Sequence, residues 1–239
     1  MPKAELVNVI DCSVLTAGEI NLKISDCILG ETKQIILQNA KNKTHLLSSL
    51  TGNIKIEVFD DTGDEFANSI NNLKIIVYGN IGKNSAQGIL KSKVTVFGSC
   101  KEDFARNANL SEFYILKNCK GNSFLNLKNS KVVIGESLDG NIASGSQDSI
   151  LLILNLDKRM FNVSRDWFKD LNNGHFFIRG DETQECFKKY DFLFNETCET
   201  DEDVILPLIS EFARLFKYSL GEIKSKPFYR INLAKETRK

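Results

Sequence analysis

The feature that most constrains this chain of 239 residues is a short β-rich segment that recurs about every 19–20 residues. The segments are rich in Ile, Val and Phe and contain no Pro, as strands with neighbours on both sides require. One central residue from each segment gives the spacing, and these residues are Ile36, Ile56, Ile76, Thr95, Ile115, Val133, Leu152 and Phe177. Their successive differences are 20, 20, 19, 20, 18, 19 and 25, so the last step contains an insertion. So regular a period predicts a tandem repeat architecture.

Two architectures suit a β-rich period of this length. An antiparallel sandwich has a turn about every 8–12 residues, whereas a parallel β-helix stacks one coil on the next. A second, shorter apolar pair lies inside several repeats, at Phe66/Ile70, Ile89/Leu90 and Phe124/Leu127, and favours a coil with more than one face around a shared core. We therefore expect a mainly β fold, a right-handed parallel β-helix of about seven coils over residues 35–180.

The N-terminal part, residues 1–34, is expected to form a β-α cap on the first coil. Residues 6–11 have the pattern of a strand. Thr16 and Glu19 form a capping-box pattern that begins a helix, and Gly30 ends it. A cap is needed because the open end of a β-helix exposes unpaired backbone groups.

The C-terminal part, residues 181–239, is expected to comprise a linker, a helix and a tail. The acidic run 196–203 reads as a linker, and the apolar spacing over 204–216 predicts an amphipathic helix with Pro207 in its first turn. Residues 228–233 are expected to lie as an extended strap. Packing of the helix on the β-helix is the favoured interpretation, and a membrane-binding or partner-binding helix is the alternative.

Composition excludes some classes of function. Lys plus Arg and Asp plus Glu are both 31, so the basic surplus that favours nucleic-acid binding is missing. No apolar stretch is long enough to span a membrane, and the first residues lack the apolar core of a signal peptide. We expect a cytoplasmic protein with no membrane or nucleic-acid partner, in which the six cysteines are reduced thiols.

The sequence offers no catalytic, cofactor or metal site. His45 and His175 lie far apart, and no Ser or Cys has a nucleophile motif around it. No Cys-x-x-Cys occurs. Cys100 and Cys119 are separated by one full period of the repeat, so we expect them to stack at equivalent positions of two coils. Both histidines are expected at exposed coil positions.

Two polar groups are expected to serve the turns between strands. The acidic group could bind a cation only if its carboxylates converged, and a solvated turn is the expected structure. The asparagines near coil corners are expected to cap backbone groups with their side-chain amides. The acidic group comprises Asp60, Asp61, Asp64 and Glu65, and the asparagines are Asn53, Asn72, Asn80 and Asn118.

The segment from Gly79 to Gly98 resembles one repeat of the glycine-rich C-terminal domain of glutamate synthase. The family repeat is Gly, two residues, Gly, three residues, Gly-x-Gly, then an apolar strand that ends in Gly. The matching structural glycines are Gly79, Gly82, Gly88 and Gly98, and Gly135 occupies a later repeat. The family glycine at position 86 is Ala86, and Lys91-Ser92 replaces a usual Gly pair. Residues 1–40, 208–217 and 223–231 are similar to the stand-alone version of this domain.

The resemblance implies a right-handed β-helix without catalytic residues or a cofactor of its own. It implies a structural subunit of a glutamate-synthase-type complex, with glutaminase-like and FMN/iron–sulfur synthase-like subunits as partners, and a homo-oligomer is possible. The alternatives are a scaffold subunit of another oxidoreductase such as formylmethanofuran dehydrogenase, and a divergent free-standing interaction protein. A polysaccharide-cleaving enzyme would need carboxylates that repeat in register on one face, and the sequence lacks that pattern.

Overall fold

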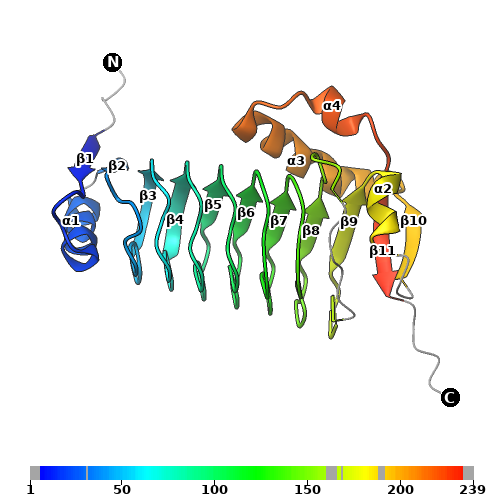
Figure 1. The fold of residues 1–239 in the computed structure, drawn as a ribbon, viewed down its shortest axis with the longest axis horizontal. Helices are drawn as coiled ribbons and strands as arrows, with labels where there is room; N and C mark the ends of the chain where they lie inside the picture. Colours follow the sequence, from blue (N-terminus) through cyan, green and yellow to red (C-terminus); the bar gives the residue numbers. More distant parts are fainter. Residues whose placement is uncertain (1–5, 31, 160–165, 168, 188–191, 234–239) are drawn as a thin grey trace.

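The computed structural model describes residues 6–30, 32–159, 166–167, 169–187 and 192–233, and in this part of the chain one sheet of 11 strands runs through the molecule (Figure 1). The strand order is β1-β2-β3-β4-β5-β6-β7-β8-β9-β11-β10. The first nine strands pair in parallel, and β11 pairs antiparallel with β9 and β10. The bounds are β1 Val7–Asp11, β2 Gln34–Gln38, β3 Thr51–Val58, β4 Asn71–Val77, β5 Lys93–Val96, β6 Glu112–Ile115, β7 Lys131–Ile134, β8 Ile150–Ile153, β9 His175–Arg179, β10 Phe192–Glu196 and β11 Phe228–Leu233.

The parallel strands form a β-solenoid, as the sequence repeat predicts, and it has about six turns. The register is more regular than the sequence suggested, because neighbours in the row Glu57, Ile76, Thr95, Tyr114, Val133 and Leu152 lie side by side at a constant sequence separation. Two of the central residues chosen from the sequence were wrong by one position. Ile56 and Ile115 point inward, one residue away from this row. The error arose because these strands carry large side chains on both faces, so alternation does not mark the inner one.

The core lies inside the coils, where one buried apolar side chain follows another along the axis. Ile75, Val94, Phe113, Val132 and Leu151 form one such row. The second apolar pairs expected from the sequence also contribute, since Phe66, Ile70, Ile89, Phe124 and Leu127 are buried and Leu90 is half-buried.

The turns place residues with left-handed backbone at fixed positions of each coil. One row consists of Ala67, Ala86, Ala105, Phe124 and Ala143, whose φ values lie between 55° and 60°. This conformation costs a residue other than Gly roughly 1–2 kcal/mol. The coil contacts on both sides must therefore stabilise it, and Ala86 shows how a family glycine can be replaced without a change in the path of the chain.

Four buried serines form a ladder along the solenoid. Each Oγ accepts a hydrogen bond from the backbone N–H one coil earlier, at 3.1–3.2 Å. Each hydroxyl also donates to the carbonyl oxygen two residues before it, at 2.7–2.8 Å. The ladder satisfies backbone N–H groups that are buried where the chain enters each strand. Its members are Ser92, Ser111, Ser130 and Ser149.

Helix α1 (Ala17–Leu29) lies at the N-terminal end of the solenoid (Figure 1). The capping box is confirmed, since the Glu19 N–H donates to Thr16 Oγ1 at 3.3 Å and the Thr16 N–H donates to Glu19 Oε2 at 2.8 Å. Ile20 and Ile24 are buried in the solenoid core. The helix ends before Gly30, whose φ of −80° is not left-handed.

The C-terminal part holds α2 (Asp181–Glu185), α3 (Glu199–Phe216) and α4 (Leu220–Lys224) besides β10 and β11. The expected linker over 196–203 is wrong, because β10 ends at Glu196 and α3 begins at Glu199. Acidic residues stabilise the first turn of a helix, so this run begins α3. Pro207 accordingly lies inside the helix and not in its first turn. The extended tail is confirmed, and as β11 it forms part of the sheet.

Candidate interaction surface

The outer face of the sheet carries three rows of side chains, one side chain from each coil per row. The rows run from β3 toward β9, parallel to the solenoid axis. They are Lys55, Lys74, Lys93, Glu112 and Lys131 for the first, Glu57, Ile76, Thr95, Tyr114, Val133, Leu152 and Phe177 for the second, and Phe59, Tyr78, Phe97, Leu116, Gly135 and Leu154 for the third.

Helix α3 covers the C-terminal half of this face (Figure 1). Its apolar side packs on the second row in a buried cluster separate from the solenoid core. Gly135 permits this packing, since a Cβ at this position would lie 2.8 Å from Phe212 Cζ and 2.2 Å from the Leu116 carbonyl oxygen. The cluster comprises Tyr114, Val133, Leu152, Leu154 and Phe177 of the sheet with Ile205, Leu208, Ile209, Phe212, Ala213, Phe216 and Ile223.

A charged contact fixes α3 at the first row. Lys93 Nζ donates to Glu211 Oε1, lies 3.5 Å from Glu112 Oε2 and sits 4.6 Å from the centre of the Tyr114 ring. Glu211 also accepts two hydrogen bonds from Arg214, at 2.7 and 2.8 Å. The bonds from Arg214, with that from Lys93, lower the pKa of Glu211 to about 2 against the opposing effect of burial. The helix is thus held by a carboxylate that stays ionised.

An aromatic row leads from the uncovered half of the face to α3. The ring centres of Phe59 and Tyr78 are 4.5 Å apart, those of Tyr78 and Phe97 are 4.9 Å apart, and Phe97 meets Phe216 of α3 edge-on at 4.9 Å. Phe59 is 53% exposed and Tyr78 is 39% exposed. Stacked aromatic side chains in this setting are typical of protein interfaces.

Glu57 links the rows in the uncovered half. Its carboxylate accepts hydrogen bonds from Gln34 Nε2 at 2.6 Å and from Tyr78 Oη at 2.8 Å, and it pairs with Lys55 Nζ at 2.6 Å. Burial alone would raise the pKa of Glu57, but the bonds from Lys55 and Tyr78 outweigh it, and the pKa is lowered. Burial and the bond to Glu57 raise the pKa of Tyr78 to about 12. Tyr78 is therefore held in one orientation as a neutral donor.

We call the uncovered half of the outer face the open face. Phe59 and Tyr78 are its exposed aromatic side chains, Lys74 is an exposed cation, and Ile36 and Ile76 are half-buried. Sequence reasoning missed this surface. The signal was present as the evenly spaced series Phe59, Tyr78, Phe97, but only the fold shows that α3 reaches Phe97 and stops short of Phe59 and Tyr78. The open face comprises Ile36, Lys55, Glu57, Phe59, Lys74, Ile76 and Tyr78.

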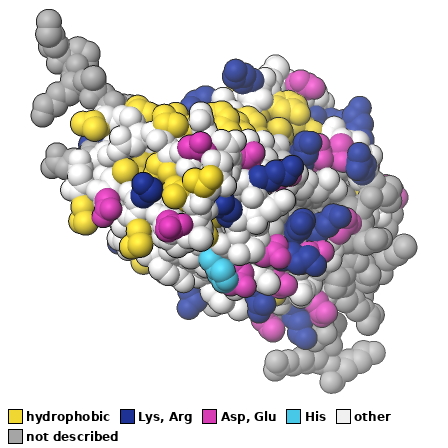
Figure 2. Space-filling view, turned by 60° about the vertical axis from the view of Figure 1, so that its left-hand side comes forward, with side chains coloured by type: hydrophobic (Ala, Val, Ile, Leu, Met, Phe, Trp, Pro, Cys, Tyr) yellow, Lys and Arg dark blue, Asp and Glu magenta, His cyan; other side chains and the backbone are white. Residues whose placement is uncertain are grey.

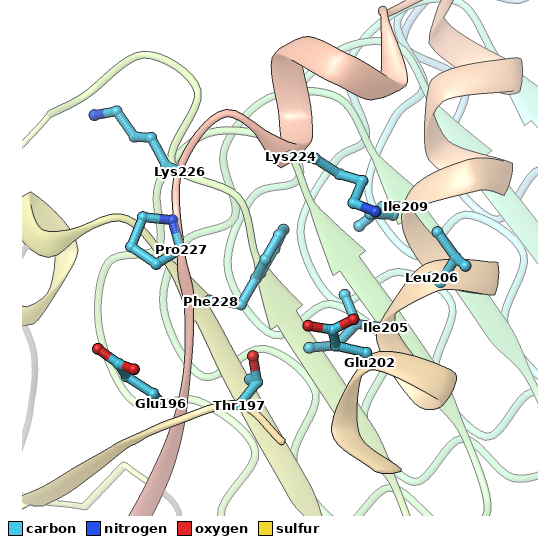
Figure 3. A pocket seen from close by; sticks show the side chains of 10 residues that line it. All are labelled: Glu196, Thr197, Glu202, Ile205, Leu206, Ile209, Lys224, Lys226, Pro227 and Phe228. Atoms are coloured by element: carbon cyan, nitrogen blue, oxygen red, sulfur yellow. The ribbon is translucent and has the colours of Figure 1, made fainter. Parts of the chain in front are cut away.

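A pocket of about 310 Å³ lies at the other end, between α3 and the start of β11 (Figure 3). Its apolar lining includes Ile205, Ile209 and Phe228, and Glu202 projects into it beside Phe228. Lys226 extends away from the pocket and pairs with the Glu182 carboxylate. The lining of the pocket thus combines apolar side chains with the polar or charged side chains of Glu196, Thr197, Glu202, Lys224 and Lys226.

The glycines singled out in the sequence serve two different purposes. At Gly79, Gly82 and Gly98, an added Cβ would lie 2.3–2.6 Å from backbone atoms of the preceding coil, so these glycines allow close stacking. Gly88 instead has a φ of 64°, and an added Cβ would make only an ordinary contact, 3.8 Å from Ser69 Oγ. The pattern thus marks close contacts between coils more than unusual backbone angles.

The histidines and the acidic group have structural partners. His45 is exposed, as expected, and its Nδ1 lies 3.1 Å from Glu65 Oε2. His175 is half-buried at the start of β9 and not in an exposed coil position, and burial lowers its pKa. The carboxylates Asp61 and Asp64 accept hydrogen bonds from backbone N–H groups one coil later, at 2.7 and 2.8 Å, so they cap the turn.

The asparagine prediction holds for two of the four residues. Asn80 Oδ1 accepts from the Ser99 N–H at 2.9 Å, and Asn118 Oδ1 accepts from the Ser137 N–H at 3.0 Å. Asn72 contributes a left-handed backbone with φ of 57°, and Asn53 lies within β3. The expected capping is therefore wrong for these last two.

The cysteines are free thiols, and Cys100 and Cys119 stack as predicted. Both are buried in a row with Ile81 and Leu138. Burial, with the neighbouring Cys119, raises the pKa of Cys100. In the described part of the chain, no three His, Cys, Asp or Glu side chains come together as a metal site would require. None of the described helices has the length and apolarity needed to cross a membrane.

Comparison of the chain with protein-family models, with curated proteins and with solved structures found no match. The resemblance to the glutamate synthase domain therefore stays a prediction. The open face, with its exposed aromatic row beside α3, is the surface whose geometry most favours binding of a partner.

Proposed function

We propose that this chain is a non-catalytic scaffold and that its open face binds a helix of a partner protein. The observation that carries the proposal is that the second row and part of the third are covered by α3 in one half of the molecule and uncovered in the other. In the covered half, Lys93 binds Glu211. Lys74 is the next residue of that row and is exposed. A partner helix with an apolar side and an acidic residue opposite Lys74 would extend the packing that α3 makes.

We propose further that the complex is of the glutamate-synthase type. The support is the resemblance of Gly79–Gly98 and of both ends of the chain to the stand-alone domain. The partners would then be glutaminase-like and FMN/iron–sulfur synthase-like subunits, in the cytoplasm. The finer description of the scaffold belongs to this proposal: a right-handed β-helix of about seven coils, with the β-α unit as a cap and the C-terminal helices as a tail.

A second candidate is a scaffold that serves a different complex, such as a formylmethanofuran dehydrogenase, or no fixed complex. It is favoured by the replaced family glycines at Ala86 and at Lys91-Ser92. This candidate keeps the open face as the binding surface and changes only the identity of the partner.

Purification of the tagged chain from its native host, with mass spectrometry of what copurifies, tests the proposal. We expect the wild-type chain to recover a glutaminase-like or flavin-containing subunit. Phe59→Glu, which places a charge in the aromatic row, should reduce that recovery at least tenfold. Leu193→Glu is the matched control, because Leu193 is 54% exposed on β10, at the other end of the sheet, and should bind as wild type does. Recovery of the chain alone, or equal binding by Phe59→Glu, would contradict the proposal.

A further inference from the structure

The N-terminal end of the solenoid gathers exposed apolar side chains. Of the 11 exposed large hydrophobic side chains in the described part of the chain, six lie between residues 6 and 29. Figure 2, in which this end comes forward, shows hydrophobic side chains gathered over it. Contiguous exposed apolar surface of several hundred Å² marks an interaction site. The six are Leu6, Val7, Val9, Val14, Leu22 and Leu29, with exposed fractions from 45% to 89%.

Among the strands that the structure describes, β1 lies at the edge of the sheet, so one side of its backbone has no paired strand there. The Leu6 carbonyl oxygen accepts from the Lys33 N–H at 3.1 Å, and the Cys12 N–H donates to the Gln38 carbonyl oxygen at 2.8 Å. Since alternate residues of a strand direct their backbone groups to opposite sides, Val7 and Val9 direct theirs away from β2. Proteins usually protect such an edge with Pro, charged side chains or a bulge, and Val7–Asp11 contains no Pro and no bulge and has a single charged residue, Asp11, at its end.

Helix α1 adds apolar surface beside this edge. Leu22 and Leu29 are two helical turns apart and therefore lie on one side of the helix. That side is opposite to the one on which Ile20 and Ile24 are buried in the core. Because α1 lies at the end of the solenoid (Figure 1), Leu22 and Leu29 are turned away from the coils, on a side that also carries Glu19 and Asp26.

We propose that two copies of this chain join at their N-terminal ends, with their β1 strands paired about a two-fold axis. A strand that pairs with its own copy through the same edge is antiparallel to it, and the resulting interface is isologous. Val7 and Val9 of each copy would then continue the outer face of one sheet into the next. Leu22 and Leu29 would be covered at the side of the same contact.

The available apolar surface suits an interface of this kind. The exposed parts of the six side chains are equivalent to about four fully exposed aliphatic side chains, or on the order of 400 Å² per copy. A standard stable interface buries about 800 Å² per partner, of which a little over half is apolar. The second copy would supply hydrogen-bond partners for the open backbone of β1. It would also supply apolar surface for the six exposed side chains to pack against.

Sedimentation equilibrium of the full-length chain tests the proposal. We expect the wild type to have twice the chain mass of 26.9 kDa. The double variant Leu22→Glu/Leu29→Glu, which changes only exposed positions, should have the mass of one chain with an unchanged circular dichroism spectrum. Val9→Lys, a charge on the open edge, should also abolish the dimer.

Phe59→Glu is the control, because Phe59 lies on the open face and not at the N-terminal end. It should stay dimeric even though we expect it to lose the partner protein, so the two proposals fail separately. A wild-type chain of single mass across a wide concentration range would overturn the dimer. So would dimers that persist in both N-terminal variants, or assemblies that grow by stacking β1 on β10 of the next copy.

Discussion

At the scale of single residues, the constant step from coil to coil places the same side chain in the same environment several times. Ser92, Ser111, Ser130 and Ser149 each accept one backbone N–H and donate to one carbonyl oxygen. A change at one of them therefore affects a bond in its own coil and a bond to the coil before it.

Ser111→Ala should destabilise the protein by about 1–3 kcal/mol, because the buried N–H of Ser92 loses its acceptor. The free energy of unfolding in urea is the measurement. Ser99→Ala is the control, since Ser99 bonds through its backbone N–H and carbonyl groups. Equal stability of Ser111→Ala and the wild type would show that the ladder contributes nothing net.

The two kinds of repeat glycine should respond differently to substitution. Gly82→Ala should cost at least about 2 kcal/mol, because its Cβ would lie 2.3 Å from the Gly63 carbonyl oxygen. Gly88→Asn should stay within about 1 kcal/mol of wild type, since Asn107 and Asn126 hold the same left-handed position in later coils. Thermal melting of both variants checks the contrast, and the reverse order would refute this division.

The sequence marked these glycines but not their separate purposes. Gly82 and Gly88 belong to the same family pattern, and nothing in the sequence shows that, of these two, Gly88 is the one with a positive φ. Whether a glycine is needed for close stacking depends on the distance between neighbouring coils. This distance is set by how the coils pack and not by the sequence of one coil.

At the scale of elements, α3 is the part of the molecule that closes half of the outer face. Sequence reasoning predicted its apolar side correctly but placed its start at Val204 instead of Glu199. The acidic first turn was taken for a linker because its residues have no apolar spacing. Strand β10 was missed for a related reason, as it pairs only with β11, whose residues lie far away in the sequence.

Attachment of α3 should weaken at low pH. The pKa of Glu211 is lowered from its ordinary 4.5 to about 2 in the folded protein. Its contribution is therefore complete above about pH 4.5 and is lost as the pH falls toward 2. Glu211→Gln should remove about 1–2 kcal/mol at neutral pH, after allowance for solvent screening, and should flatten stability over this range.

Hydrogen exchange of the α3 backbone amides gives the readout for this prediction. In Glu211→Gln, exchange should be faster over 204–216 and unchanged in the central strands. Equal acceleration in both regions would mean that the Glu211 contacts stabilise the whole fold and not the helix in particular.

At the scale of the whole molecule, each coil contacts only its neighbours, so opening should begin at the ends. The thiols report this order. Cys198 is exposed, Cys12 and Cys186 are buried near the two ends, and Cys100 and Cys119 are buried in the middle. Maleimide labelling followed by mass spectrometry should modify Cys198 first, Cys12 and Cys186 next, and the central pair last, because both central thiols are buried and burial raises the pKa of Cys100. Modification of the central pair as fast as Cys198 would oppose a stacked, buried ladder.

The β-solenoid itself could be predicted, because the regular spacing of the repeats does not depend on the exact bounds of any single strand. The binding surface was not, because it depends on where α3 ends on a face that the sequence does not distinguish from the core. Ile56 and Ile115, both assigned to the wrong row, show the same limit at smaller scale.

The constant step between equivalent residues of β3 to β8 also bears on how such a chain can change length. Adding or removing one whole unit, for example 112–130, would restore every lateral neighbour and would lengthen or shorten the open face by one strand. Adding a single residue within a strand would instead turn each following side chain of that strand to the opposite face, whereas the longer steps from Ile36 to Glu57 and from Leu152 to Phe177 show that the turns accept extra residues. Lengthening the open face thus takes complete units, and the distance between the dimer end and α3 can vary only in steps of one strand spacing, about 4.8 Å.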